Sequence, residues 1–319
     1  MTERHAHAVD PADEGRHPDG PEPLWNESVY LDVVAADGSL GAYARIGRYP
    51  NLGVTWWTAT VVRPGRPTLI SADYGLPVAD GTGLELTSDG FDLAMVVEAP
   101  LERMRVTGLA PAVAVARPAD AYRVGAGEAA SIALDLTWET DGVPYHYDIT
   151  TRYEIPCLVG GSVTIDGETF AVEGEGQRDH SWGVRDWWAF GWCWFAGRLE
   201  DGTRVHGADI RLPGAPMAFG YVQRPWGEVE PVTGLDVTER TDGDGFAETA
   251  RIVMAPSGIA LEVSPAAWGP VLLTAPDGRS SRFPRAMVDL VADDGRRGRG
   301  WIEWNQPAGP APEAGGGER

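Results

Sequence analysis

The chain has 319 residues, of which 43% are hydrophobic and 23% charged, so it is long enough for a buried core and for two domains. All 26 basic residues are arginines, which excludes Schiff-base chemistry, a lysine general base and a P-loop phosphate clamp. The chain has 47 acidic residues and a net charge of -21, which disfavours nucleic acid and anionic membranes as partners.

Both ends of the chain are predicted to be disordered tails. Residues 1–22 are acidic and rich in Pro, Gly and His without periodicity, and residues 307–319 have a similar composition. The first tail lacks the apolar core of a signal peptide, and no apolar run approaches the roughly 20 residues that span a bilayer. We therefore expect a cytoplasmic protein without membrane insertion. Because His5, His7 and His17 fall in the first tail, three histidines remain for a site in the folded part.

Between the tails the pattern indicates β-structure. Asp-Gly pairs recur from residue 37 to residue 294, often between alternating or β-branched runs, which is a strong hairpin signal. The chain has 41 glycines and 25 prolines, and helical spacing of apolar residues is not sustained anywhere. We therefore predict an antiparallel all-β protein of sandwich or barrel type. A break near residues 154–161 divides it into β domains of residues 23–156 and 157–306.

The N-terminal half contains two informative segments, WNESVYLDV (25–33) and RIGRYPNLGVTWW (45–57). Gly, Pro and Asn in the second segment predict a tight connection followed by a strand. Polar residues around this connection either contact a ligand at a pocket mouth or hold the corner together, and they are Arg45, Arg48, Tyr49 and Asn51. Farther along the chain, a set of alternating polar residues is expected to face solvent, and it comprises His146, Asp148, Thr150, Arg152 and Glu154.

The segment from residue 174 to residue 211 differs from the rest of the chain. Five tryptophans fall within 13 residues, at positions 182, 187, 188, 192 and 194. A solvated loop does not require five indoles, so we expect them to line a core or a large apolar cavity. The side chains predicted to bind a ligand are Trp182, Trp187, Trp192, Trp194, Arg185 and Arg211.

His180 lies beside Asp179, just before the Trp-rich strand. A histidine next to carboxylates can titrate near neutral pH and serve as a general acid or base. The alternative is a histidine that only holds the loop together through hydrogen bonds. The neighbouring pairs Arg178-Asp179 and Arg185-Asp186 are interpreted as ion pairs that brace the loop.

The hairpin that follows can be aligned by its turn. With Asp201-Gly202 as a two-residue turn, Trp194 lies opposite Asp209. Asp209 then shares a face with indoles and guanidinium groups, which predicts a catalytic role beside His180. The alternative is a structural ion pair with a nearby arginine, Arg198 or Arg211.

The histidines and cysteines predict no metal site. The spacing of the two cysteines is typical of neither a metal site nor a redox motif. His206 falls on a mostly apolar face and is expected to be a packed histidine. In the assumed register His206 and Asp209 face opposite ways, which argues against a mononuclear site with His180. We therefore expect neither a metal ion nor an organic cofactor.

The segment RDHSWGVRDWW (178–188), followed by the hairpin WFAGRLEDGT (194–203), resembles a two-domain lipocalin-like superfamily. This superfamily includes AttH-like proteins and hydroxyneurosporene synthase, a carotenoid hydratase. Together with WNES and RIG-YPN in the first half, the motif is most similar to an uncharacterised bacterial branch, over about residues 24–306. The resemblance implies two lipocalin-like β-barrels or half-barrels packed together.

The resemblance also implies roles for particular residues. In the hydratases the proposed acid-base group is a His and a Trp of this motif with a Tyr and an Asp one strand later. His180 and Trp182 match the first pair, and Asp209 matches the aspartate. Gly207 stands at the position of the tyrosine.

Three functions remain open. The first is a cofactor-independent enzyme that hydrates, cyclises or isomerises a hydrophobic, isoprenoid-like or polycyclic small molecule by acid-base chemistry. His180 or Asp209 would move the proton, and indole faces would stabilise developing positive charge. The second is a non-catalytic lipocalin-like carrier of an apolar ligand. The third is an accessory protein without a ligand, and a homodimer is left open for each of them.

Overall fold

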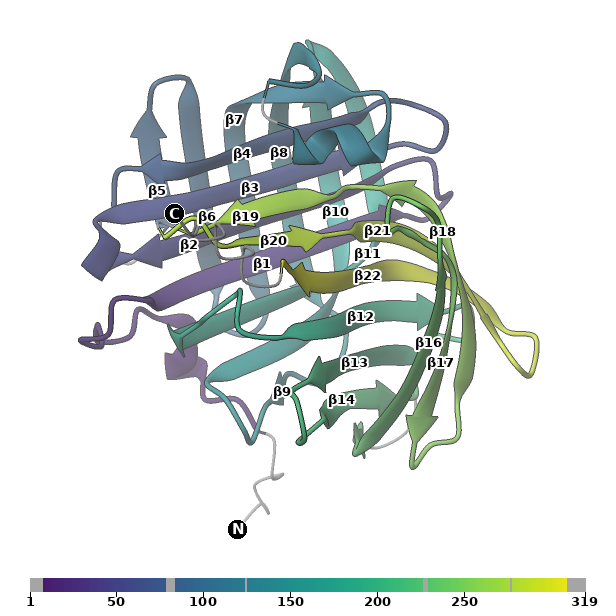
Figure 1. Ribbon diagram of the computed structural model, residues 1–319. Helices are drawn as coiled ribbons and strands as arrows, with labels where there is room; N and C mark the ends of the chain where they lie inside the picture. Colours follow the sequence, from purple (N-terminus) through teal and green to yellow (C-terminus); the bar gives the residue numbers. More distant parts are fainter. Residues whose placement is uncertain (1–7, 79–83, 124, 226–228, 276, 309–319) are drawn as a thin grey trace, which may run out of the picture.

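The computed structural model describes residues 8–78, 84–123, 125–225, 229–275 and 277–308, and within these ranges it contains 22 strands and three short 3-10 helices (Figure 1). The strands pair antiparallel in two large sheets. The prediction of an antiparallel all-β protein is therefore confirmed. In the described ranges no helix has the length and apolar character needed to cross a membrane.

The first sheet forms a closed barrel. Its strands are β1 (Trp25–Ala35), β2 (Gly41–Tyr49), β3 (Val54–Val62), β4 (Thr68–Leu76), β5 (Leu84–Ser88), β6 (Phe91–Ala99), β7 (Arg103–Val115), β8 (Glu128–Thr140), β9 (Tyr145–His146), β10 (Arg152–Ile165) and β11 (Glu168–Val184). They follow the order β4-β3-β2-β1-β11-β10-β8-β7-β6-β5, with β9 on β10. Because β4 also pairs with the end of β7, the sheet closes on itself.

The second sheet is strongly curved and lies against the first (Figure 1). Its strands are β12 (Gly191–Leu199), β13 (Arg204–Arg211), β14 (Met217–Gln223), β15 (Val229–Val232), β16 (Gly234–Thr241), β17 (Ala247–Ala255), β18 (Ala260–Trp268), β21 (Arg285–Ala292) and β22 (Arg297–Pro307). The hairpin of β19 (Val271–Thr274) and β20 (Ser280–Phe283) joins β22. The short 3-10 helices are η1 (Pro11–Glu14), η2 (Pro50–Leu52) and η3 (Pro118–Tyr122).

Strand β1 is buried on both faces because it lies between two layers. Alternate residues such as Val29 and Leu31 point into the barrel core, and the others face the second sheet. On that outer face Tyr30 packs with Trp194 and Trp301 of the second sheet. The indole N–H of Trp301 donates to the carbonyl of Val33 at 3.1 Å. The predicted arrangement of two lipocalin-like β units packed together is confirmed.

The predicted boundary between residues 156 and 157 falls inside β10. This strand pairs with β8 and β11 as part of the first sheet, and the second sheet begins only at Gly191. The predicted break near residues 154–161 ends in glycines, and at these glycines neighbouring strands approach each other closely. A Cβ added at Gly161, where φ is +138°, would lie 2.1 Å from the carbonyl oxygen of Asp135. The RDHSW motif therefore belongs to the first sheet.

The predicted N-terminal tail is anchored to the barrel within the described residues, which begin at residue 8. Glu14 is buried, and it accepts hydrogen bonds from Arg178 at 2.7 Å and from the Tyr153 hydroxyl. Arg48 pairs with Asp19, and the Asn51 amide donates to the carbonyls of residues 20 and 22. Composition did not reveal these contacts, because single polar anchors rather than an apolar face hold the segment. Arg48 and Asn51 thus hold this corner together.

Other parts of the two predicted tails lie outside the described residues. These parts are residues 1–7, with His5 and His7, and residues 309–319. Within the second predicted tail, Pro307 is the last residue of β22.

The register of the hairpin of β12 and β13 differs by one residue from the prediction. Leu199 and Thr203 close a three-residue loop, with Gly202 at φ +84°. Trp194 consequently pairs with Ala208, and Cys193 pairs with Asp209. Because side chains alternate between faces, this slip moves Asp209 to the face opposite Trp194. It also brings His206 onto the face that carries Trp194.

Candidate functional site

Strand β11 divides the residues of the DHSW segment between two faces of the barrel. Asp179 and Ser181 point toward the second sheet and line a cavity there. His180 and Trp182 point inward, where His180 contacts Tyr153 and Trp182 packs against the barrel core. The structure therefore does not bring His180 and Trp182 into the predicted cavity, because neighbouring residues of a strand face opposite ways.

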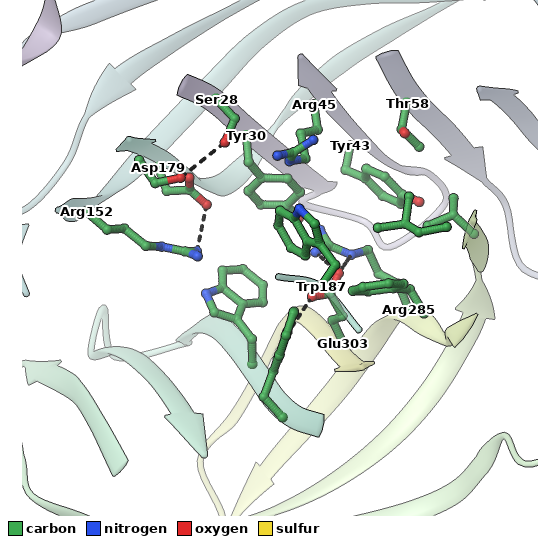
Figure 2. Close-up of a pocket in the computed structure, with 16 residues that line it drawn as sticks. Ser28, Tyr30, Tyr43, Arg45, Thr58, Arg152, Asp179, Trp187, Arg285 and Glu303 are labelled. Carbon is green, nitrogen blue, oxygen red and sulfur yellow. Dashed lines mark hydrogen bonds and ion pairs between the residues drawn. The ribbon is translucent and has the colours of Figure 1, made fainter. Parts of the chain in front are cut away.

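The cavity between the sheets combines indoles with ionisable groups (Figure 2). It has a volume of about 80 Å³. Its apolar wall is formed by Trp187, Trp192, Trp194, Val271, Leu273 and Phe283. Its charged groups are Arg45, Arg152, Asp179, Arg285 and Glu303. This is the cavity in which three of the predicted ligand-binding tryptophans converge.

The N–H group of each of these indoles donates a hydrogen bond within the protein. Trp187 donates to the Tyr49 hydroxyl at 2.9 Å, and Trp192 donates to Glu303 at 3.1 Å. Trp194 donates to Glu154 at 3.1 Å. With their polar edges engaged in this way, the rings can meet a ligand only through their π faces, which attract cations. Guanidinium groups already lie near two of these rings, Arg45 at 4.8 Å from the ring centre of Trp187 and Arg285 at 5.5 Å from that of Trp194.

Arg285 and Glu303 form a buried ion pair at one end of the cavity. The Nε of Arg285 donates to Oε2 of Glu303 at 2.8 Å, and one terminal nitrogen donates to the same oxygen. The guanidinium lies 4.3 Å from the ring centre of Tyr30 and 4.7 Å from that of Tyr43. Its Nη1 has no hydrogen-bond partner among the described residues. One cationic donor therefore remains for a bound molecule.

Asp179 lies at the other end of the cavity, opposite Arg285 and Glu303 (Figure 2). Its Oδ2 accepts a hydrogen bond from Arg152 at 2.7 Å. Burial raises the pKa of Asp179 to about 7, with the negative charge of Glu154 adding to the rise and Arg152 opposing it. A carboxyl group that titrates near neutral pH can both give and take a proton.

Glu154 is fully buried at the centre of a polar network between the sheets. It accepts hydrogen bonds from Arg152 at 2.6 Å and Gln177 at 2.9 Å, in addition to that of Trp194. Burial opposes ionisation, but Arg152 and these donors hold the pKa of Glu154 below its usual range. Glu154 is thus the anion of the network, and its charge helps to keep Asp179 protonated.

His206 lies beside this network as a packed histidine, as the sequence predicted. Burial lowers its pKa, so the imidazole is neutral at neutral pH. The Nδ1–H donates to the carbonyl of Phe195 at 2.8 Å, and Nε2 contacts the Tyr147 hydroxyl. That hydroxyl donates to Glu154 at 3.0 Å.

Arg45 supplies a second cationic donor to the cavity. Its guanidinium lies 4.8 Å from the ring centre of Trp187. Its Nη2 is buried without a hydrogen-bond partner among the described residues. Arg185 is nearby, and burial followed by the charge of Arg152 lowers its pKa to about 10. Arg185 does not line the cavity and donates instead to Thr150 at 2.9 Å.

Asp32 lies behind the cavity and gives the protein a pH-dependent stability. It accepts from the Tyr30 hydroxyl and the Gln177 backbone N–H, both at 2.8 Å. Burial raises its pKa from 3.8 to about 7 against these hydrogen bonds. The unfolded chain ionises Asp32 at lower pH than the folded chain, so the free energy of unfolding falls as the pH rises toward 7.

We expect Asp32→Asn to remove this contribution. Between pH 5 and pH 8 the wild type should lose about 2–3 kcal/mol of stability through Asp32, and the variant should lose correspondingly less. Urea unfolding at both pH values measures the difference. An unchanged pH dependence in the variant would show that Asp32 does not titrate in this range.

The structure places Asp209 and Arg211 away from the cavity. Arg211 donates to Asp209 at 3.1 Å and to Glu239 at 2.8 Å, and the Arg211 side chain is exposed. The structural ion pair with Arg211, one of the alternatives open for Asp209, is the one observed. A shift of one residue in the register turns Asp209 to the face opposite Trp194, so neither Asp209 nor Arg211 lines this cavity. Their catalytic and ligand-binding roles stay predictions.

The remaining residues of the Trp-rich segment have other partners. Trp188 donates to the carbonyl of Leu273 at 3.3 Å and packs beside Trp56. Asp186 pairs with Arg279 at 3.2 Å. Arg178 and Asp179 do not pair with each other but with Glu14 and Arg152, as described above. Ion pairs therefore brace this segment, but with partners that are distant in sequence.

Several residues of the site were not predicted from the sequence, among them Tyr30, Arg152, Glu154, Arg285 and Glu303. Arg152 and Glu154 were expected to face solvent because they alternate with other polar residues, yet Glu154 has no exposed surface. Nothing in the sequence around Arg285 on β21 or Glu303 on β22 indicates that the two side chains pair with each other. Tyr30 could have been found, since polar and aromatic residues fill every second position of WNESVYLDV.

One family model, the domain of unknown function DUF7064, matches residues 10–308, which is nearly the whole described chain. The chain belongs to this family. The match includes the N-terminal segment, the first barrel and the second sheet. No curated protein sequence is significantly similar to the chain.

Several solved structures share the fold. A putative AttH protein of Nitrosomonas europaea is 16% identical, with a TM-score of 0.63. The match covers 94% of this chain and 97% of that protein. Kievitone hydratase of Nectria haematococca is 12% identical, with a TM-score of 0.60 and 88% coverage of both chains. CghA, whose structure was solved with Sch210972, is 12% identical, with a TM-score of 0.59 and 89% coverage of both. The predicted resemblance to the lipocalin-like AttH fold is thereby confirmed.

Proposed function

We propose that the cavity between the sheets is the active site of an enzyme that hydrates, cyclises or isomerises a hydrophobic small molecule. The observation that carries the proposal is Asp179, whose pKa is raised to about 7 in a cavity walled by three indoles. A protonated carboxyl beside π faces is suited to the formation of a carbocation-like intermediate, because each ring face contributes roughly 0.5–2 kcal/mol of attraction to a cation. No organic cofactor takes part in this proposal.

The proposed chemistry begins with transfer of the Asp179 proton to an alkene carbon of the substrate. The electron pair of the double bond forms the new C–H bond, and the neighbouring carbon becomes cationic beside Trp192 and Trp194. In a hydration, water adds to that carbon and returns one proton to the Asp179 carboxylate. In an isomerisation, the carboxylate instead removes a proton from an adjacent carbon. Both sequences leave Asp179 protonated for the next turnover.

Two arginines suggest which polar group the substrate carries. Arg45 Nη2 and Arg285 Nη1 are buried N–H donors without partners among the described residues, and both arginines line the cavity. A buried unsatisfied donor costs about 1–3 kcal/mol, which a carbonyl, phenolate or carboxylate oxygen of the substrate would recover. We therefore infer a mostly apolar substrate with one such oxygen.

Substrate entry requires movement of side chains. The cavity of about 80 Å³ is small beside the roughly 300–1,000 Å³ of typical ligand sites. Trp187 is the best candidate to move, since it is half-buried and lies in the connection between β11 and β12. It is held by hydrogen bonds to Tyr49 and Asn305 rather than by a strand.

The comparisons support this proposal at the level of the fold. Kievitone hydratase is a hydratase by name, and CghA was solved with the small molecule Sch210972. The same architecture therefore occurs in proteins that handle small organic molecules.

The test uses a panel of prenylated phenols and polyenes incubated with the protein in deuterated water. The wild type is expected to convert at least one compound, detected by mass spectrometry as gain of water or of deuterium on carbon. Asp179→Asn should reduce the rate by about 100-fold or more, because it removes the proton donor while keeping the shape of the side chain. Asp209→Asn is the matched control and should retain the wild-type rate.

Two results would contradict the proposal. Equal rates for Asp179→Asn and the wild type would remove Asp179 from the chemistry. Binding of a panel compound that is released unchanged, by wild type and variant alike, would instead identify a carrier.

A further inference from the structure

The inner face of the first barrel holds a second group of chemically active side chains, separate from the cavity between the sheets. It consists of His17, Glu27 and His180. Glu27 lies on β1 and His180 on β11, and both point into the barrel. His17 follows η1 in the N-terminal segment. The sequence does not reveal this group, because His17 lies in a segment with the composition of a disordered tail.

We propose that His17, Glu27 and His180 bind a divalent transition-metal ion, with zinc as the best match. Their donor atoms all lie within 4.8 Å of one another. The Nδ1 of His17 lies 2.8 Å from Oε1 of Glu27, and the Nε2 of His180 lies 3.2 Å from the same oxygen. In a tetrahedral zinc site with bonds of about 2.0–2.1 Å, neighbouring ligand atoms are about 3.3–3.4 Å apart. The two nitrogen–oxygen distances would have to lengthen by only about 0.1–0.6 Å to reach this value.

The surroundings of the two imidazoles are those of metal-binding histidines. The second nitrogen of His17 lies 3.5 Å from a carboxylate oxygen of Asp13. The second nitrogen of His180 lies 3.3 Å from the Tyr153 hydroxyl. Metal-bound histidines usually hydrogen-bond through their other nitrogen, which fixes the tautomer and the ring orientation. The His17 ring is also stacked on Trp182, with centres 3.6 Å apart and planes at 9°.

The fourth position of such an ion has space for water. A cavity of about 30 Å³ is lined by two of the three ligands, Glu27 and His180, and by Arg48. This volume accommodates one or two water molecules. Two histidines, one carboxylate and an open position form a donor set that suits zinc and its neighbours in the first transition series.

The alternative is a network of hydrogen bonds without metal. Oε1 of Glu27 also accepts from the backbone N–H of His17 at 2.9 Å, and both imidazoles could donate to it. The two states differ in the protons that they require. In the network each ring donates an N–H to Glu27, whereas metal binding requires a lone pair on the same ring nitrogens.

The experiment is a calorimetric titration of the full-length, EDTA-treated protein with Zn²⁺. We expect one ion per chain with a Kd of about 1 µM or lower. His17→Ala and Glu27→Gln should each weaken binding by about 100-fold or more, and His146→Ala should match the wild type. Asp179→Asn should also bind normally, since Asp179 points to the other side of β11. The metal proposal and the proposed function can therefore fail independently.

A second measurement does not depend on the variants. Co²⁺ bound to the wild type should show the intense visible absorption of a four-coordinate site, and Zn²⁺ should displace it. Absence of saturable Zn²⁺ binding by the wild type would overturn the proposal and leave the hydrogen-bond network. Equal affinity in the wild type and in a folded His17→Ala variant would place the ion elsewhere and overturn it as well.

Discussion

Replacement of Glu154 by alanine is expected to lower the free energy of unfolding by about 3–5 kcal/mol, because it leaves the charge of Arg152 partly uncompensated inside the protein. Glu154 has no exposed surface and accepts from Arg152, Gln177 and Trp194. The alanine variant removes all of these acceptors at once. The Trp194 N–H, which donates to Glu154 across the two sheets, would also lose its partner.

Urea unfolding at neutral pH measures this effect. Glu154→Gln keeps an acceptor oxygen and the shape of the side chain, so it should lose less stability than the alanine variant. Asp209→Asn disrupts an ion pair with a largely exposed arginine and should change stability by less than about 1 kcal/mol. Similar losses in Glu154→Ala and Asp209→Asn would show that the buried network does not stabilise the packing of the sheets.

Arg285→Met is expected to have an effect of similar size, about 3–5 kcal/mol, since it leaves the buried carboxylate of Glu303 without its cation. The physical reason is the cost of an unpaired buried charge rather than the strength of the pair. Removal of both partners should therefore cost much less than the sum of the single changes. The double variant Arg285→Met with Glu303→Gln is expected to recover most of the lost stability.

A double-mutant cycle in urea measures the coupling between the two residues. We expect a coupling free energy of at least about 2–3 kcal/mol in favour of the pair, at or above the upper end of the usual range for residues in direct contact. Additive single effects would contradict the interpretation that the two charges depend on each other. In Arg285→Met, Glu303 still accepts a hydrogen bond from the Trp192 N–H, which lies 3.1 Å away. This remaining partner limits the loss of stability.

The turns of this protein could be read from the sequence because their chemistry is local. Asp37-Gly38 lies between β1 and β2, and Asp166-Gly167 lies between β10 and β11. Both glycines have positive φ, at +73° and +87°, which residues with a side chain rarely adopt. Burial of the indoles could be expected as well, since so many of them in a short segment require it. Trp187, Trp192 and Trp194 line the cavity, whereas Trp182 packs against the barrel core and Trp188 beside Trp56.

The predictions that failed depended on partners distant in sequence. Asp209 was placed beside Trp194 by a turn that is one residue longer in the structure, and a slip of one residue reverses both faces of a strand. Arg152 and Glu154 were assigned to solvent because nothing near them in sequence reveals the second sheet that covers them. The N-terminal segment was assigned to a tail because its anchors, Glu14 and His17, meet their partners only in the folded barrel.

The sequence by itself thus determined the antiparallel β class, many of the hairpins and the aromatic wall of the cavity. These features follow from local backbone preference and from the hydrophobic effect, which act on short segments. The tertiary structure alone decided which face of β11 meets the second sheet, and therefore that Asp179 joins the indoles while His180 meets His17 and Glu27. The reason is that both faces of β1 and β11 are covered around the site. The alternation of side chains along a strand therefore shows which residues share a face, but not what that face contacts.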